Sequence, residues 1–341
     1  MKYKYVVTAA FFSILMVTRI CSHTPFSHEL HLEYFSKADG GVSCSDMTLH
    51  LHGWGLNGSD VEDLAAILPG TVVTFDLPDA PRDRSSDFKI LSKMIPKTSF
   101  GQLPEVLVAV RVLREALQRC DPERLFLVGC SRGGSLALNM TYFLLLASGR
   151  YAPITRADSM ALQVFRRALH RVDVSAEECG IMLDKLLRGG LIMDCPPANI
   201  NRLFTKQNIR MILPFVLPQT AIQIGLRYMT NYRRDGMQAE YSLARINQLC
   251  PELNCLLHLE QFDKVVGGAV ENQAFVRALL GQDVLPTCLG IRRFHEGTDP
   301  NGHFYDRTNS SLAGEVRVFL WAIATYGKSN TAPVRNVTLS A

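Results

Sequence analysis

The sequence predicts an α/β protein in which helices cover both faces of a mostly parallel sheet. From residue 46 to residue 146, short apolar runs rich in branched residues alternate with longer segments of helical spacing. Such alternation is typical of parallel sheets, whose strands are buried on both faces. The chain has 341 residues, of which 47% are hydrophobic and 20% are charged. It is therefore long enough for one large core with an inserted subdomain.

Residues 23–150 are expected to form the first part of the core. The runs that predict strands in this part are residues 29–35, 46–55, 70–81 and 123–130. Leucine and valine recur at helical spacing in residues 101–120, and residues 135–146 are apolar enough for a buried helix. Pro78 and Pro81 end the third predicted strand, because proline cannot donate a hydrogen bond to a strand ladder.

Residues 151–250 are expected to form a helical cap region with one core strand near residues 190–195. Residues 151–188 contain two amphipathic patterns. Residues 199–250 are mostly helical in pattern but irregular, and Pro214 and Pro218 exclude a continuous membrane helix there.

Residues 251–327 are expected to complete the core, and residues 328–341 to form a flexible tail. The pattern predicts a strand and loop at 254–266, a helix at 272–280, a strand at 288–297 and a closing helix at 311–327.

The first residues have the layout of a secretory signal peptide. Lys2 and Lys4 precede an apolar stretch at residues 5–17, and small or polar residues lead to a cut expected after Ser22. Residues 1–22 therefore predict export to the periplasm or the medium. The alternatives are a membrane-associated amphipathic N-terminus or a buried first strand. In these cases the protein would be membrane-associated or cytoplasmic.

Charge and cysteine content narrow the classes of partner. The net charge of +4 is spread along the chain, and no basic stripe interleaved with aromatic residues accompanies it, so nucleic acid is not expected as a partner. None of the spacings of the nine cysteines resembles a metal site, and no metal or organic cofactor is implied. An even eight would remain to pair after signal cleavage, but the strand-like surroundings of Cys130 and Cys195 favour packed thiols.

The stretch "LFLVGCSRGG", residues 125–134, surrounds one serine with glycines. Gly129 and Gly133 lie two residues before and two after Ser131, which is the spacing of a nucleophile elbow. In that turn a predicted strand passes into a predicted helix and raises the hydroxyl above the sheet. A glycine-rich turn without catalysis is the alternative that the spacing alone leaves open.

A second stretch, "LHLHGWGLNG", supplies the complementary part of an acyl-transfer site. A strand that ends in His-Gly-x-Gly offers a backbone N–H to a developing oxyanion, here the N–H of Trp54. The N–H of Arg132, next to the serine, would be the second donor. The alternative for His52 and Trp54 is a buried polar turn that packs an indole.

With these motifs the chain resembles the α/β-hydrolase superfamily, over residues 46–325. "LHGWGLNG" looks like the oxyanion loop of small carboxylesterases, "VGCSRGG" like their elbow, "LEQFDKVV" like the loop of the catalytic acid and "NGHFYD" like the terminal histidine loop. Residues 228–266 also resemble the approach to the acid in prolyl-oligopeptidase-like members. Two features depart from the family pattern: the long helical stretch at 151–188, and Leu259 where many members have glycine. These two departures bear on the substrate class more than on the fold.

The resemblance implies a role for each of three residues. Ser131 would attack a carbonyl, His303 would remove the serine proton and later protonate the leaving group, and Asp263 would orient the imidazole. His295 competes with His303, but it lies in a strand-like run. Glu260 and Asp194 compete with Asp263, since each follows or ends a predicted strand.

The sequence thus predicts a serine hydrolase that cleaves an ester, thioester or related acyl bond. Its partner would be a small-molecule acyl substrate, with membrane or lipid proximity left open. The oligomeric state is not predicted. A serine peptidase of prolyl-oligopeptidase type and a hydrolase-like protein that binds without turnover are the alternatives.

Overall fold

The computed structural model describes residues 32–35, 45–54, 56, 61–77, 99–205, 232, 236–270, 272–280, 290–304, 306–307 and 311–326. The predicted signal peptide, the predicted tail and residues 206–231 of the predicted cap lie outside the described residues. No helix in the described ranges is both long enough and apolar enough to cross a membrane.

Seven strands form one sheet in the order β1-β3-β2-β4-β5-β6-β7. They are β1 (Leu32–Phe35), β2 (Asp46–Leu51), β3 (Thr71–Phe75), β4 (Arg124–Cys130), β5 (Gly190–Asp194), β6 (Cys255–Glu260) and β7 (Arg292–Gly297). The edge strand β1 is antiparallel to β3, and every other neighbouring pair is parallel. The predicted α/β class with a mostly parallel sheet is confirmed.

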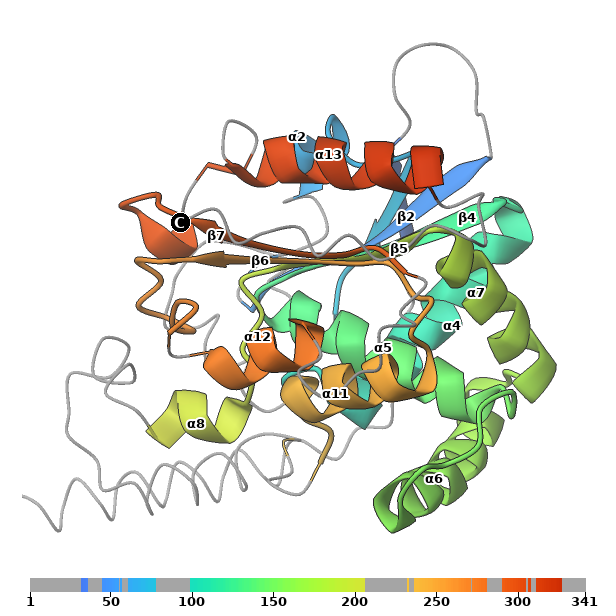
Figure 1. Ribbon diagram of the computed structural model, residues 1–341. Coiled ribbons are helices and arrows are strands. Elements are labelled where there is room, and N and C mark those ends of the chain that lie inside the picture. The colour runs from blue at the N-terminus through green and yellow to red at the C-terminus, as the bar shows by residue number, and fades with distance from the viewer. Residues whose placement is uncertain are drawn as a thin grey trace, which may run out of the picture.

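Helices cover both faces of the sheet (Figure 1). They are α2 (Glu62–Ala65), α4 (Leu103–Arg119), α5 (Arg132–Ala147), α6 (Arg156–Val172), α7 (Ala176–Arg188), α8 (Ile200–Thr205), α11 (Ala239–Leu249), α12 (Gln273–Leu280) and α13 (Ser311–Tyr326), with a 3-10 turn at Gly302–Phe304. In Figure 1, α2 and α13 lie above the sheet, whereas α4, α5, α11 and α12 lie below it.

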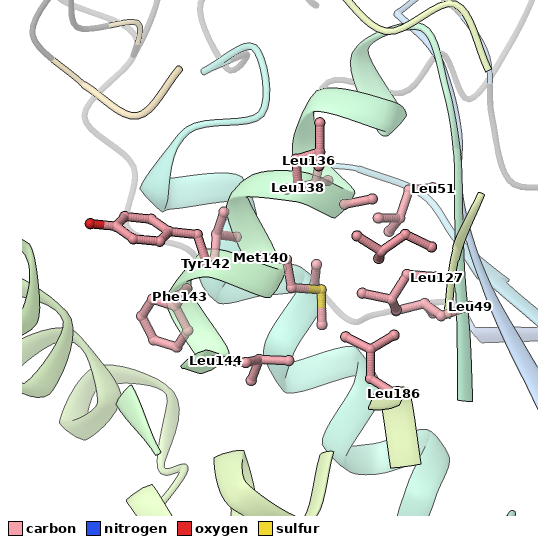
Figure 2. Close-up of a cluster of buried hydrophobic side chains, with 14 of the residues drawn as sticks. Leu49, Leu51, Leu127, Leu136, Leu138, Met140, Tyr142, Phe143, Leu144 and Leu186 are labelled. Atoms are coloured by element: carbon pink, nitrogen blue, oxygen red, sulfur yellow. The ribbon is translucent and has the colours of Figure 1, made fainter. Parts of the chain in front are cut away.

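The central helix α5 is buried along its whole length. Its apolar side chains pack against those of β2 and β4, and Figure 2 shows Leu49, Leu51 and Leu127 facing this helix. On its other sides α5 contacts α4, α6, α7 and α11. Because α5 begins at Arg132, this packing also fixes the position of the preceding residue, Ser131.

The amphipathic segment 151–188 forms α6 and α7. Each begins with a capping box, made by Thr155 with Asp158 and by Ser175 with Glu178. Both helices contact α4 and α5, and α7 also contacts β4. These contacts place the segment in the helical layer. The helical cap expected from residues 151–250 stays a prediction, since residues 206–231 lie outside the described residues.

Candidate active site

Ser131 lies on a strained turn between β4 and α5. Its φ of 51° and ψ of −122° place a non-glycine residue in a sparsely populated backbone region. Such conformations cost on the order of 1–3 kcal/mol and persist where the surrounding structure holds them. Here the Ser131 N–H donates to the carbonyl of Asp194 at 2.7 Å. The backbone thus has the geometry that a nucleophile elbow requires.

The glycines of this turn are required by close backbone approach. A Cβ on Gly133 would lie 1.8 Å from the carbonyl oxygen of Leu51, and one on Gly129 would lie 2.2 Å from the carbonyl oxygen of Gly133. Both distances are far inside van der Waals contact. A side chain at Gly133 would therefore push the turn away from β2, and one at Gly129 would push the start of α5 away from β4. Either change would displace Ser131.

His303 and Asp263 are brought together by the loops after β7 and β6. The Nδ1 atom of His303 lies 2.8 Å from Oδ2 of Asp263. The N–H groups of Val265 and Val266 donate to the other oxygen, Oδ1, at 2.8 Å and 2.9 Å. The side chain of Asp263 is fully buried, whereas that of His303 is 11% exposed. The carboxylate is therefore fixed in direction, and the imidazole reaches the surface.

The end of β5 connects this pair to the serine turn. Asp194 accepts the Ser131 N–H, and its neighbour Cys195 lies in a group with Asp263 and His303 whose donor atoms are all within 4.8 Å of one another. Cys195 itself has a positive φ of 45°. The predicted serine, acid and histidine therefore gather at the carboxyl ends of β4, β5, β6 and β7.

The turn after β2 lies against Ser131, as the predicted oxyanion loop requires. A Cβ on Gly53 would be 3.5 Å from Cβ of Ser131. The Leu77 N–H donates to Nε2 of His52, so the proton of this imidazole is on Nδ1, which contacts the Gly53 carbonyl at 2.8 Å. Burial lowers the pKa of His52 well below its usual value, with the positive charge of Arg132 adding to the effect. The neutral ring therefore bonds Leu77 and Gly53 and stabilises the loop that carries Trp54.

Arg132 is the first residue of α5, where backbone N–H groups have no acceptor within the helix. Its guanidinium is buried, and Nη1 lies 3.9 Å from Oε1 of buried Glu105. Glu105 also accepts the N–H groups of Ser99 and Gly101 at 2.5 Å and 2.8 Å. This buried pair holds the start of α4 against the start of α5.

The competing residues occupy other positions. His295 lies on β7, where Nδ1 is 3.6 Å from Glu315 and the ring stacks on that of His258 at 5.4 Å. Glu260 accepts the Asp299 N–H at 3.0 Å. Asp194 contacts His258 and Arg307. Asp263, by contrast, lies within hydrogen-bond distance of His303.

Sequence reasoning missed a row of polar side chains that crosses the sheet beneath the serine turn. Cys130, Asp194, His258 and His295 are register partners on β4, β5, β6 and β7. The available signal was a cysteine, aspartate or histidine near the carboxyl end of each of these strands. Their common register depends on strand pairing, which the sequence did not specify.

Two groups in the described part of the chain have the side chains to hold a cation. One is Asp194, Cys195 and His258, and the other is Cys195, Asp263 and His303. In the first, Arg307 already neutralises Asp194 at 2.5 Å. In both, burial raises the pKa of the Cys195 thiol well above its usual value, with Asp194 and Asp263 adding to the effect. A cation at either group would need the Cys195 thiol in its thiolate form.

Comparisons with known proteins give structural likeness only. No family model matches the chain, and no curated protein matches it. MenH from S. aureus is 13% identical, with 86% of this chain and 99% of that one covered at a TM-score of 0.45. An α/β serine hydrolase without a lid from Xanthomonas campestris is 14% identical, with 86% and 88% covered at 0.42. A monoacylglycerol lipase from Paleococcus ferrophilus is 14% identical, with 87% and 99% covered at 0.40.

The fold is the α/β-hydrolase fold, and the strand order defines it. Six parallel strands in the order β3-β2-β4-β5-β6-β7, an antiparallel β1 at one edge and a strained serine turn after β4 are its distinguishing features. The resemblance expected from the motifs is thus confirmed at the level of the fold. Fold alone does not assign a reaction, so the activity has to be argued from the site.

Proposed function

We propose that this protein is a serine hydrolase that cleaves an ester, thioester or related acyl bond through an acyl-enzyme. The observation that carries the proposal is the 2.8 Å contact between His303 Nδ1 and buried Asp263, beside a strained turn that presents Ser131. A nucleophile, a base and a residue that orients the base are the minimum set for acyl transfer by this route.

Each residue then has a defined step. The Ser131 hydroxyl attacks the acyl carbon while His303 takes its proton, and the Trp54 and Arg132 N–H groups stabilise the oxyanion. When the tetrahedral intermediate collapses, His303 gives the proton to the departing alcohol or thiol. A water molecule, deprotonated by His303, then attacks the acyl-enzyme and releases the acid and Ser131. Asp263 holds the imidazole in the required tautomer throughout.

A labelling experiment tests this proposal. A fluorophosphonate probe should modify the purified protein at Ser131, identified by peptide mass spectrometry, and Ser131→Ala should remove the label. Ser135→Ala is the matched control, because Ser135 is a buried serine one turn into α5 that bonds the Pro197 carbonyl. If probes of several sizes leave folded wild-type protein unlabelled, the proposal is wrong and binding without turnover becomes the better interpretation.

A second assay on the purified protein distinguishes ester cleavage from peptide cleavage. Matched ester and amide substrates with a common acyl group should be turned over at very different rates if the enzyme is an esterase. Comparable cleavage of the amide would favour the peptidase alternative.

A further inference from the structure

The end of β5 is bonded to both halves of the candidate site. The backbone carbonyl of Asp194 accepts the N–H of Ser131 at 2.7 Å. Its side-chain Oδ2 accepts Nε–H of Arg307 at 2.5 Å. Arg307 lies four residues beyond His303 in the loop after β7. One residue is therefore in direct contact with the serine turn and with the histidine loop.

The carboxylate of Asp194 is held from a second direction. Nδ1 of His258 lies 3.0 Å from Oδ1 of Asp194, and both side chains are almost completely buried. The His258 carbonyl also accepts the N–H of Cys195 at 2.8 Å. Both carboxylate oxygens of Asp194 and the N–H of Cys195 are therefore hydrogen-bonded, which fixes the position of the oxygen that accepts from Arg307.

The other end of the histidine loop is fixed as well. Glu260 Oε2 accepts the Asp299 N–H at 3.0 Å. A Cβ on Gly302, whose φ is 59°, would lie 2.4 Å from the carbonyl of Phe262, so this loop passes directly against the residue before Asp263. His303 is thus carried on a short loop with one anchor at Asp299 and a second at Arg307.

We propose that Asp194 and Arg307 are positioning residues that hold the loop of His303 in register with Ser131. A buried ion pair contributes little net stability, because desolvation offsets its attraction, and its better-supported role is to select one arrangement. Acyl transfer is sensitive to such an arrangement, since a displacement of about 1 Å can cost about 10²-fold in rate. This inference rests on the proposed serine hydrolase function.

Arg307→Ala tests the anchor. We expect kcat for an activated ester to fall about 10²-fold with KM changed less than about threefold, because the substrate contacts remain while the base is displaced. Arg307→Lys, which keeps the charge, should recover kcat to within about tenfold of the wild type. Should the alanine variant fail to fold, Arg307→Gln provides the same comparison.

A matched control separates position from stability. Arg293 on β7 forms a comparable, partly buried pair with Glu315, with Nε 2.9 Å from Oε2. Arg293→Ala should lower the melting temperature as Arg307→Ala does while leaving kcat within about twofold. In a His303→Ala background, Arg307→Ala should produce no further loss of the residual rate, because a positioning residue acts through the base that it positions.

The possible outcomes are distinct. Wild-type protein that no probe labels at Ser131 would overturn the proposed function and this inference with it. A labelled, active wild type whose Arg307→Ala variant keeps its kcat would overturn the inference alone. The inference is equally wrong if Arg293→Ala reduces kcat as much as Arg307→Ala, or if the Arg307 effect persists without His303.

Discussion

Two aspartate–histidine pairs lie near the same edge of the sheet and differ in what surrounds them. His303 contacts Asp263 at 2.8 Å and is 11% exposed, whereas His258 contacts Asp194 at 3.0 Å and is fully buried. The Nε2 atom of His258 faces the Ser311 hydroxyl and Glu260, each at 3.3 Å. Almost equal contacts therefore occur in a surface loop and in a strand interior. An aspartate–histidine contact alone does not identify a catalytic pair.

The largest expected difference between the two pairs is in turnover. Asp263→Asn should lower kcat about 10⁴-fold, because the imidazole loses both its tautomer and the partner of its developing charge. Apparent affinity should change little. Steady-state kinetics on an activated ester give both values.

Asp194→Asn and Glu260→Gln are the controls for that experiment. Each should stay within about tenfold of the wild type, or about 1.4 kcal/mol, and an asparagine at position 194 can still accept from Arg307. A collapse of turnover in either control, with Asp263→Asn near normal, would mean that the assigned acid is wrong.

The second pair should show its effect in stability. His258→Ala removes one partner of a buried contact and leaves the carboxylates of Asp194 and Glu260 without it. We expect a loss of about 3 kcal/mol in the free energy of unfolding, measured with urea. The corresponding loss for His303→Ala should be smaller, since the N–H groups of Val265 and Val266 continue to donate to the Asp263 carboxylate. Equal losses would remove the distinction between the two pairs.

Periodicity and motif order predicted much of this molecule, because each depends on neighbouring residues. The predicted strand at 123–130 corresponds to β4, and the predicted closing helix at 311–327 to α13. The order of serine, acid and histidine motifs also led to Asp263 and His303, which the fold brings into contact.

Other features depend on how distant segments pair. The Arg307–Asp194 contact spans 113 residues and requires the observed register of β5. The amphipathic patterns in residues 151–188 identified an apolar face without specifying what covers it. The helices of this segment pack against α4 and α5, and these tertiary contacts cannot be read from an amphipathic pattern.

His50, which is buried and forms no aspartate pair in this comparison, provides the smallest test. His50 on β2 lies 3.9 Å from Cys130 Sγ, and its Nδ1 has no hydrogen-bond partner in the described part of the chain. Burial lowers its pKa to about 3, with Arg307 adding to the effect. The folded protein therefore excludes a proton that the unfolded chain binds below about pH 6.5.

The sign of the resulting pH dependence follows. The stability that neutral His50 contributes is present above about pH 6.5 and is lost as the pH falls toward 3. His50→Gln should reduce the slope of unfolding free energy against pH by about 1.4 kcal/mol per unit between pH 6 and 4. Urea unfolding at a series of pH values measures the slope, and an unchanged slope would show that His50 is protonated in the fold.

The contacts of Asp194 with Ser131 and Arg307 also bear on the order in which the chain folds. Ser131, Asp263 and His303 come from segments far apart in the sequence, and they meet only when β4, β5, β6 and β7 have all paired in parallel. Parallel pairing of distant strands is slow relative to the formation of local helices. Reactivity at Ser131 should therefore return after helical circular dichroism during refolding, and it would report the last long-range pairing rather than collapse.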